Sequence, residues 1–269
     1  MTDSPIRLLL SDVDGTLITT DKVLTPETVR AVAQLREHDV LFSLTSARPP
    51  RGFSMFVDPL ELTAPLGAFN GGLMVRPDMS PISELPVESS IVEPIIGALR
   101  SSGLSIWVYQ NTDWFVLDLE GPHVAHESEV VGFGPTPIAS FEDLRLDVVK
   151  IVGVSDDPAE IARGLEALRE FDIAATTSQT YYLDVTNPRA NKGSVVEFLA
   201  RYFSIDVGSI ATIGDAANDV AMFQRSGLSI AMGNALDAVK STASHVTASH
   251  DDNGFASAVS EFILPHVSA

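Results

Sequence analysis

The 269-residue chain contains no cysteine. This absence excludes a disulfide framework, catalysis by a thiol, and a zinc or iron–sulfur site held by cysteine ligands. It indicates the compartment only weakly, and we expect an intracellular, cytoplasmic protein. The first residues, Met1 to Pro5, also lack the basic start that is typical of a secretory signal.

Basic residues are scarce. The chain has 17 Lys and Arg against 36 Asp and Glu, which gives a formal net charge of −19 at pH 7. A surface of this charge repels nucleic acid and anionic lipid, so we expect no nucleic-acid partner and no membrane partner. It also repels a phosphorylated metabolite. A phosphate site in this chain therefore needs a local cation, either a metal ion or well-placed Lys and Arg side chains.

Long apolar runs are missing as well. No stretch approaches the about 20 consecutive apolar residues that a membrane-spanning helix needs. The hydrophobic share of 45% and the charged share of 20% are those of an ordinary globular protein. A chain of this length can form two domains with separate cores. We therefore expect a soluble two-domain protein, as a monomer or a small homo-oligomer.

Short apolar runs alternate with helical patterns near both ends of the chain. Thr25 and Pro26 are typical of an N-cap and a first helical residue. The strand–helix–strand order, with strands that lack polar alternation, predicts a parallel sheet covered by helices. The predicted strands are 6–10, 40–44, 65–69, 210–214 and 228–231, and the later helices are 193–202, a helix through Met222, and 254–263.

The middle of the chain has a different character. Three prolines (Pro77, Pro81 and Pro86) crowd a short stretch, which we interpret as a crossover into a second domain, and a helical pattern follows over 91–99. After it come strand-like runs at 105–109 and 114–118, which could form a hairpin, and at 148–154, 173–177 and 181–185. A further helix begins beyond Asp157, which is its predicted N-cap. We interpret 76–187 as an α+β domain inserted into a first domain that comprises 1–75 and 188–269.

Three predicted strands end in polar or acidic residues, namely Asp12, Ser46 and Asp215. In an open parallel sheet, ligands bind beyond the carboxyl ends of the strands. These three side chains are therefore expected to converge on one edge, although they are far apart in the sequence.

Two carboxylates stand two residues apart in Asp12-Val13-Asp14-Gly15-Thr16-Leu17. Adjacent carboxylates repel each other and raise one pKa unless a cation lies between them. One of them could attack phosphorus while the other moves a proton to and from the leaving oxygen. The alternatives are a plain acidic turn and a calcium loop. The calcium alternative is disfavoured because Gly15 directly follows Asp14, where an EF-hand has a further acidic ligand.

A second acidic cluster, Gly214-Asp215-Ala216-Ala217-Asn218-Asp219, lies at the junction of a buried strand and a helix. Its carboxylates suit Mg²⁺, a hard cation that prefers oxygen ligands, but the cluster taken alone favours capping of the helix. Lys192, at a predicted helix start, could pair with a phosphoryl group, or it could be a solvated surface lysine. Ser46 could donate to a phosphate oxygen and Asn70 with Gly71 could approach a substrate; each could also be an ordinary turn residue.

In combination, these segments resemble the haloacid dehalogenase-like phosphatases, specifically the Cof-type group, whose α/β cap is inserted between the second and third motifs. The resemblance covers essentially the whole chain. The four motifs are 12–17, 46–48, 192–193 and 214–219, and 70–72 and 231–235 also look like signatures of the group. The implied fold is α/β, with a Rossmann-like parallel-sheet core and an inserted α+β cap. The implied activity is Mg²⁺-dependent hydrolysis of a small phosphate ester.

The resemblance also implies roles for individual residues. Asp12 would be the nucleophile that forms an aspartyl-phosphate, and Asp14 the general acid and then the general base. Ser46 and Lys192 would hold the phosphoryl oxygens.

Further implied roles concern the metal ion and the substrate. The implied Mg²⁺ ligands are Asp12, Asp14 (through its backbone carbonyl), Asp215 and Asp219, although Asp219 could instead orient Lys192. The implied substrate-binding residues are Arg48, Asn70, Gly71 and Asn218.

Three positions depart from the pattern of the group. Ser46 stands where Thr is usual and Ala47 where Gly is frequent, but the hydroxyl is retained and we expect activity to survive. Asp184 stands where Glu is frequent, which concerns the substrate more than the chemistry.

Substrate choice is expected to belong to the cap, and a sugar phosphate is the expectation by analogy with the family. The cap residues that could contact a sugar or ring, or could equally be packed or exposed, are Trp107, Tyr109, Trp114, His123, His126 and Arg145. Two other functions stay open: a phosphomutase of the phosphomannomutase type and a catalytically silent module that binds Mg²⁺.

Overall fold

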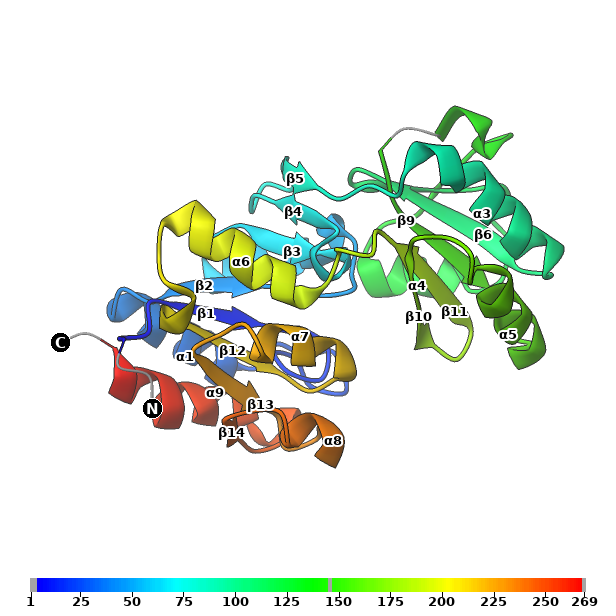
Figure 1. Cartoon of the computed structure of the whole chain (residues 1–269). Helices are drawn as coiled ribbons and strands as arrows, with labels where there is room; N and C mark the ends of the chain where they lie inside the picture. Colours follow the sequence, from blue (N-terminus) through cyan, green and yellow to red (C-terminus); the bar gives the residue numbers. More distant parts are fainter. Residues whose placement is uncertain (1–3, 145–146, 268–269) are drawn as a thin grey trace.

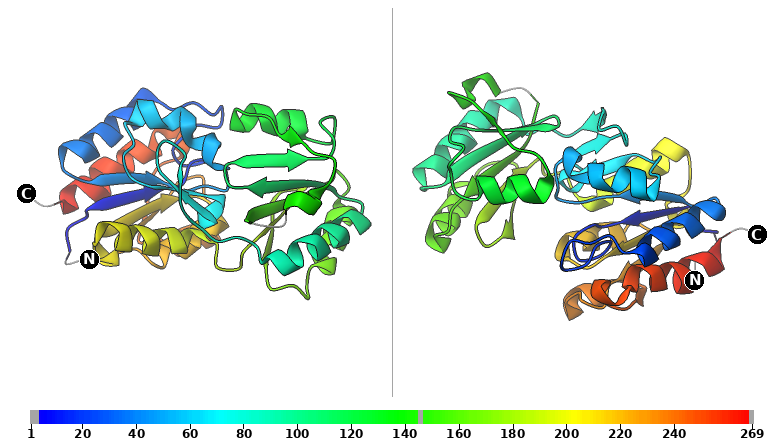
Figure 2. Two further views of the ribbon diagram at one scale, coloured as in Figure 1. Left: turned by 90° about the horizontal axis from the view of Figure 1, so that it is seen from above. Right: turned by 180° about the vertical axis from the view of Figure 1, so that it is seen from behind.

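The computed structural model describes residues 4–144 and 147–267 (Figure 1). Its elements form two groups that lie side by side, each built around its own large sheet (Figures 1 and 2). The first and last parts of the chain build one group and the middle part builds the other.

The first group contains a five-stranded parallel sheet. In spatial order its strands are β14 (His245–Val246), β13 (Leu228–Ala231), β12 (Ile210–Gly214), β1 (Leu8–Ser11) and β2 (Leu41–Leu44). The three central strands are buried along their whole length, as expected when helices cover both faces of a sheet. The structure thus confirms the predicted parallel-sheet α/β fold.

Helices pack on both faces of this sheet. Side chains of α1 (Pro26–Glu37) and α9 (Gly254–Ala258) share one apolar cluster with Leu9, and those of α6 (Lys192–Phe203), α7 (Val220–Phe223) and α8 (Asp237–Lys240) share another with Leu8. Thr25 is the N-cap of α1, as predicted, because its hydroxyl accepts from the Thr28 N–H at 3.2 Å. A π-helix, Val259–Ile263, continues α9, and α2 (Ser54–Leu60) follows a 3₁₀ turn at Pro50–Phe53.

A small antiparallel sheet joins the two groups. It consists of β3 (Leu66–Ala68), β4 (Leu73–Val75) and β5 (Pro81–Glu84). The proline-rich stretch was predicted as a crossover only, yet Pro81 starts a strand. A proline is tolerated there because β5 is at the edge of its sheet.

The second group contains a six-stranded sheet, and its strands in spatial order are β10 (Ala174–Gln179), β11 (Tyr182–Thr186), β9 (Val148–Val154), β6 (Ser105–Gln110), β7 (Asp113–Val116) and β8 (Thr136–Pro137). The predicted hairpin of β6 and β7 is confirmed. Asp157 caps α5 (Pro158–Ala167), as the sequence predicted. That helix and α3 (Ser89–Ser101) cover one face, and α4 (Val124–Val131) faces the first group (Figure 1).

The other face of this sheet is aromatic and meets the first group. Trp107, Tyr109 and Trp114 are almost fully buried there, and the ring of Tyr109 lies 5.1 Å from that of Phe69. These three cap candidates are therefore packing residues in this structure. Arg145, another candidate, lies outside the described residues.

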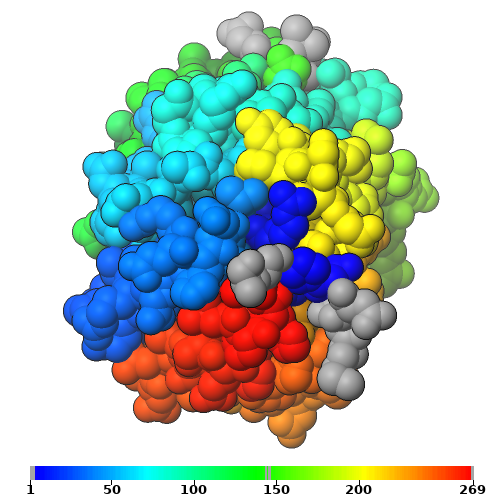
Figure 3. All heavy atoms as spheres, turned by 90° about the vertical axis from the view of Figure 1, so that its left-hand side faces the viewer, coloured from blue at the N-terminus to red at the C-terminus, as the bar shows by residue number. Residues whose placement is uncertain are grey.

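The two ends of the first group meet. The Ile6 N–H donates to the His266 carbonyl at 2.8 Å, and Figure 3 shows the red C-terminal segment against the dark blue N-terminal segment. Among the residues that the structure describes, no helix has the length and apolar character needed to cross a bilayer.

Candidate active site

The carboxyl ends of β12, β1 and β2 bring Asp215, Asp12 and Ser46 to one edge of the parallel sheet. Gly15 shapes the turn after the first strand with a φ of +82°. A Cβ on Gly15 would lie 2.4 Å from a carboxylate oxygen of Asp215, so only glycine allows the two acidic segments to approach this closely.

Lys192 is the cation at the centre of the acidic cluster. Its side chain is 1% exposed, and its ammonium group lies 2.5 Å from a carboxylate oxygen of Asp12 and 2.5 Å from one of Asp219. It is the first residue of α6, which Asn191 caps by accepting from the Ser194 N–H. This placement excludes the alternative of a solvated surface lysine.

The electrostatics of the cluster are dominated by burial. Burial raises the pKa of Asp12 to about 8; Lys192 opposes this effect, and the neighbouring Asp219 and Asp215 add to it. Burial also raises the pKa of Asp215, and Asp219 contributes in the same direction. For Lys192, burial favours the neutral amine, but attraction to Asp12 and Asp219 outweighs it and the pKa rises. One ammonium group thus faces three carboxyl groups, so acidic groups outnumber basic groups in the cluster.

The acidic cluster has the donors that a magnesium ion requires. Asp12, Asp215 and Asp219 each offer one carboxylate oxygen, and these atoms lie within 4.8 Å of one another. Both oxygens of Asp219 also have protein partners: one pairs with Lys192, and the other accepts from the Asp215 and Ala216 N–H groups at 2.9 and 2.8 Å. Asp219 therefore supports the loop as well as offering a ligand atom.

Asp14 points away from the three other carboxylates. Arg48 donates to both of its oxygens at 2.8 and 2.9 Å, and Lys22 approaches one of them at 2.7 Å. Burial by itself would raise the pKa of Asp14, but Arg48 and Lys22 outweigh burial and lower it to about 2. Lys22 was not predicted as a site residue. The sequence offered one indication of its role, because Lys22 is one of only four lysines and follows Asp14 by eight residues.

The remaining predicted residues lie at the same edge. The Ser46 hydroxyl accepts from the Arg48 N–H at 3.2 Å, and its carbonyl accepts from the Asn70 N–H at 2.8 Å. The Asn218 amide donates to the Asn70 side chain at 3.2 Å. Gly71 has a φ of +96°, and a Cβ there would lie 2.8 Å from a backbone oxygen at the start of α6. The structure therefore brings every predicted site residue into one region.

Asn234 completes the site from a segment to which the sequence analysis gave no role. Its amide donates to the Gly15 carbonyl at 2.9 Å and to a carboxylate oxygen of Asp215 at 3.1 Å. The only sequence signal was the motif-like segment 231–235.

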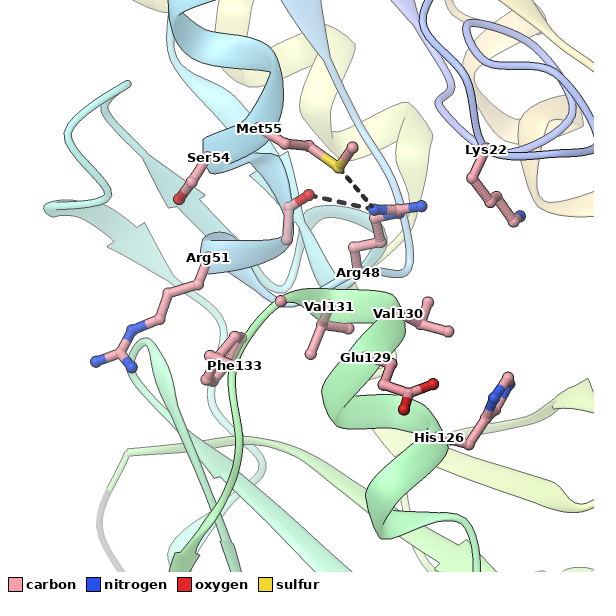
Figure 4. Close-up of a pocket in the computed structure, with 12 residues that line it drawn as sticks. Lys22, Arg48, Arg51, Ser54, Met55, His126, Glu129, Val130, Val131 and Phe133 are labelled. Atoms are coloured by element: carbon pink, nitrogen blue, oxygen red, sulfur yellow. Dashed lines mark hydrogen bonds between the residues drawn. The ribbon is translucent and has the colours of Figure 1, made fainter.

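A cavity of about 710 Å³ opens beside Asp14, between the first group of elements and α4 (Figure 4). Lys22 and Arg48 line it from one side, and His126, Glu129 and Val130 line it from α4 (Figure 4). The other lining residues are Arg51, Gly52, Ser54, Met55, Val131, Gly132 and Phe133. The volume is typical of a site for a small metabolite.

Arg51 connects the two walls of this cavity through two contacts. Arg51 lies over the ring of Phe133 at 4.9 Å and pairs with Asp113 of β7 at 2.6 Å. Of the two histidine candidates, His126 lines the cavity, whereas His123 pairs with Asp156 at 2.7 Å and stacks on Tyr181.

Comparison with known proteins agrees with this architecture. The family of haloacid dehalogenase-like hydrolases matches residues 9–259. A Haemophilus influenzae protein that is named as a phosphatase is 30% identical over 252 residues, which cover 93% of this chain and 95% of that protein. The Bacillus subtilis protein YitU, named as a 5-amino-6-(5-phospho-D-ribitylamino)uracil phosphatase, is 24% identical over 95% of this chain and 97% of its own length.

Solved structures show the same fold. A haloacid dehalogenase-like hydrolase of Bacteroides thetaiotaomicron superposes with a TM-score of 0.87 at 24% identity and covers 95% of this chain and 98% of its own. The protein TM0651 of Thermotoga maritima gives 0.85 at 20% identity, with coverage of 96% and 97%. The chain belongs to the haloacid dehalogenase-like hydrolase family, and it is a phosphatase of this superfamily. The resemblance to the Cof-type group is thus confirmed.

Proposed function

We propose that the protein hydrolyses a small phosphorylated metabolite, a sugar or polyol phosphate, through an aspartyl-phosphate on Asp12 and with the help of Mg²⁺. The observation that carries this proposal is the buried contact of the Lys192 ammonium group with Asp12 inside an acidic cluster at the sheet edge. Phosphoryl transfer is catalysed chiefly by positioning and by neutralising charge, and this cluster offers both.

In the proposed reaction, a carboxylate oxygen of Asp12 attacks phosphorus and the ester P–O bond breaks. Asp14 gives a proton to the leaving oxygen and then takes one from the water that attacks the aspartyl-phosphate, which regenerates Asp12 and releases phosphate. Lys192 and Ser46 hold the phosphoryl oxygens. Because Arg48 and Lys22 keep Asp14 ionised, we infer that the bound ester draws Arg48 away and that Asp14 takes up a proton from water before it acts as an acid.

The residues that would hold Mg²⁺ are Asp12, Asp215 and the backbone carbonyl of Asp14, with Asp219 in support. Carboxylate and carbonyl oxygens are the donors that this ion prefers. When bound, the ion supplies positive charge that the cluster of three carboxyl groups and one ammonium group lacks.

The relatives support the substrate class. Three Bacillus subtilis proteins that match nearly the whole chain, YitU, YwtE and YcsE, are named as phosphatases of a phosphoribitylamino compound, whose phosphorylated part is a polyol chain. We propose that 1–75 and 188–269 form the catalytic domain and that 76–187 form the cap that covers it and selects the substrate. A metabolite substrate would place the protein in the cytoplasm.

The test is a screen of phosphorylated metabolites, with Mg²⁺ and with chelator, on the unaltered protein and on Asp12→Asn. We expect metal-dependent release of phosphate that Asp12→Asn loses, while Asp172→Asn, at an exposed aspartate, retains it. Unchanged activity in Asp12→Asn would refute the mechanism, and activity in chelator would refute the cofactor. Conversion of a hexose 1-phosphate to its 6-phosphate would show a mutase, and metal binding without turnover would show a silent module.

A further inference from the structure

A second buried ion pair lies outside the acidic cluster, on the aromatic face of the six-stranded sheet. Lys150 of β9 and Asp184 of β11 are 8% and 5% exposed, and their charged groups are 3.0 Å apart. The other carboxylate oxygen of Asp184, Oδ1, is buried without a hydrogen-bond partner among the described residues. The pair therefore has unused hydrogen-bonding capacity.

A contribution to the stability of the fold does not explain why this ion pair is buried. The free-energy cost of removing two charges from water commonly exceeds the gain from their attraction. Apolar residues in the same place are therefore often at least as stabilising as a buried ion pair. Buried polar atoms are almost always hydrogen-bonded in native proteins, so an orphaned carboxylate oxygen points to a partner that binds from outside.

The position of the pair connects it to the active site. The Lys150 ammonium group lies 6.0 Å from the ring centre of Phe69, the residue directly before Asn70. Alternate residues of β9 and β11 point to one face, and Lys150 and Asp184 are on the face that carries Tyr109 and meets Phe69. The pair thus faces the segment that contributes Asn70 to the site.

The helix α4 links the pair to the cavity. Glu127 accepts from the Tyr182 hydroxyl at 3.3 Å, and burial raises its pKa while Lys150 opposes the rise. The neighbouring His126 and Glu129 line the cavity beside Asp14 (Figure 4). The helix α4 therefore borders both the cavity and the face of the sheet that carries Lys150 and Asp184.

We propose that Lys150 and Asp184 recognise neighbouring hydroxyl groups on the carbon chain of the substrate, one hydroxyl donating to Asp184 Oδ1 and another accepting from Lys150. This assignment rests on the proposed function and narrows its substrate to phosphorylated polyols and sugars. Because both side chains are buried, the ligand reaches them when the six-stranded sheet separates from the catalytic group, as lids do. Both residues determine specificity and take no part in the chemistry.

Binding tests this assignment apart from hydrolysis. In an Asp12→Asn background with Mg²⁺, calorimetry compares a hexitol 6-phosphate with n-hexyl phosphate, which has the same chain length without hydroxyls, and with inorganic phosphate. We expect the Asp12→Asn protein to bind the hexitol ester more tightly than n-hexyl phosphate by tenfold or more. Adding Asp184→Asn should lower this preference by roughly tenfold or more, because a site built for hydroxyls discriminates strongly. Inorganic phosphate should bind equally to the proteins with and without Asp184→Asn. Hydrolysis by the unaltered protein is measured separately, so a failure of the proposed activity is seen independently.

Two further variants separate recognition from structure. Exchanging the charges, with Lys150→Asp and Asp184→Lys together, retains an ion pair but moves the carboxylate. This double variant should therefore be as thermally stable as the unaltered protein, but it should not prefer the hexitol ester. Glu166→Gln, on α5 and in an exposed ion pair with Arg169, should change neither the thermal stability nor the ligand preference. An Asp12→Asn protein without preference, an Asp184→Asn variant that keeps it or weakens all three ligands equally, or a charge exchange that restores it would overturn the assignment.

Discussion

Replacing Lys192 with methionine should change activity and metal response in opposite directions. Methionine keeps most of the buried volume but removes the ammonium group that contacts Asp12 and Asp219. The loss of one preorganised charge-stabilising donor typically lowers kcat by about a hundred- to a thousandfold. The three carboxyl groups then have no cation of their own, so we expect them to bind Mg²⁺ more tightly.

The effect on stability follows from the burial of the pair. Removing one partner of a buried ion pair costs about 3–5 kcal/mol. In a chain of this size, about 1 kcal/mol lowers Tm by about 2–4 °C, so Lys192→Met should melt roughly 6–20 °C lower in chelator. Because the pKa of Asp12 is already raised to about 8, this carboxyl can take up a proton, and the loss should lie near the lower limit.

The assays are steady-state kinetics and thermal unfolding over a series of Mg²⁺ concentrations. We expect Lys192→Met to gain more in Tm from Mg²⁺ than the unaltered protein, while its kcat is a hundredfold lower or more. Lys240→Met, on α8, is the matched control and should behave as the unaltered protein. A variant that keeps kcat within tenfold, or that Mg²⁺ stabilises no more than the unaltered protein, would refute the role given to Lys192.

Further predictions concern Asp12 and Gly15. The folded pKa of Asp12, about 8, lies above its unfolded value of about 3.9, so its contribution to stability is complete below about pH 4 and is lost as pH rises towards 8. In chelator, the free energy of unfolding should therefore fall more steeply over this range for the unaltered protein than for Asp12→Asn; equal slopes in urea titrations would contradict this. Gly15→Ala should lower the free energy of unfolding by about 1–3 kcal/mol and abolish the Mg²⁺ response, because it adds backbone strain and a collision with Asp215. Gly132→Ala shares the positive φ but meets open space, so it should keep the Mg²⁺ response.

The order of helices and strands could be predicted from local sequence patterns. The strands 148–154, 210–214 and 228–231 were predicted with the bounds that the structure has, and Thr25 and Asp157 were predicted as helix caps. Both signals are local: a buried strand is marked by an apolar run between turn residues, and a helix start is marked by a capping side chain. Each can therefore be recognised within a few residues of the sequence. The strand β5 was missed because Pro81 and the prolines on either side of the strand gave a local signal against a strand, and pairing with β4 decided otherwise.

The sequence by itself determined which residues end the strands of the parallel sheet and that Lys192 begins a helix, and therefore which acids and which lysine could meet. Only the tertiary structure decided their partners: Lys22 on Asp14, Asn234 on the Gly15 carbonyl, and Lys150 on Asp184. The last two pairs join residues 219 and 34 positions apart. Such contacts depend on how sheets and helices pack, and packing also removes water from around the charges, which sets their pKa values.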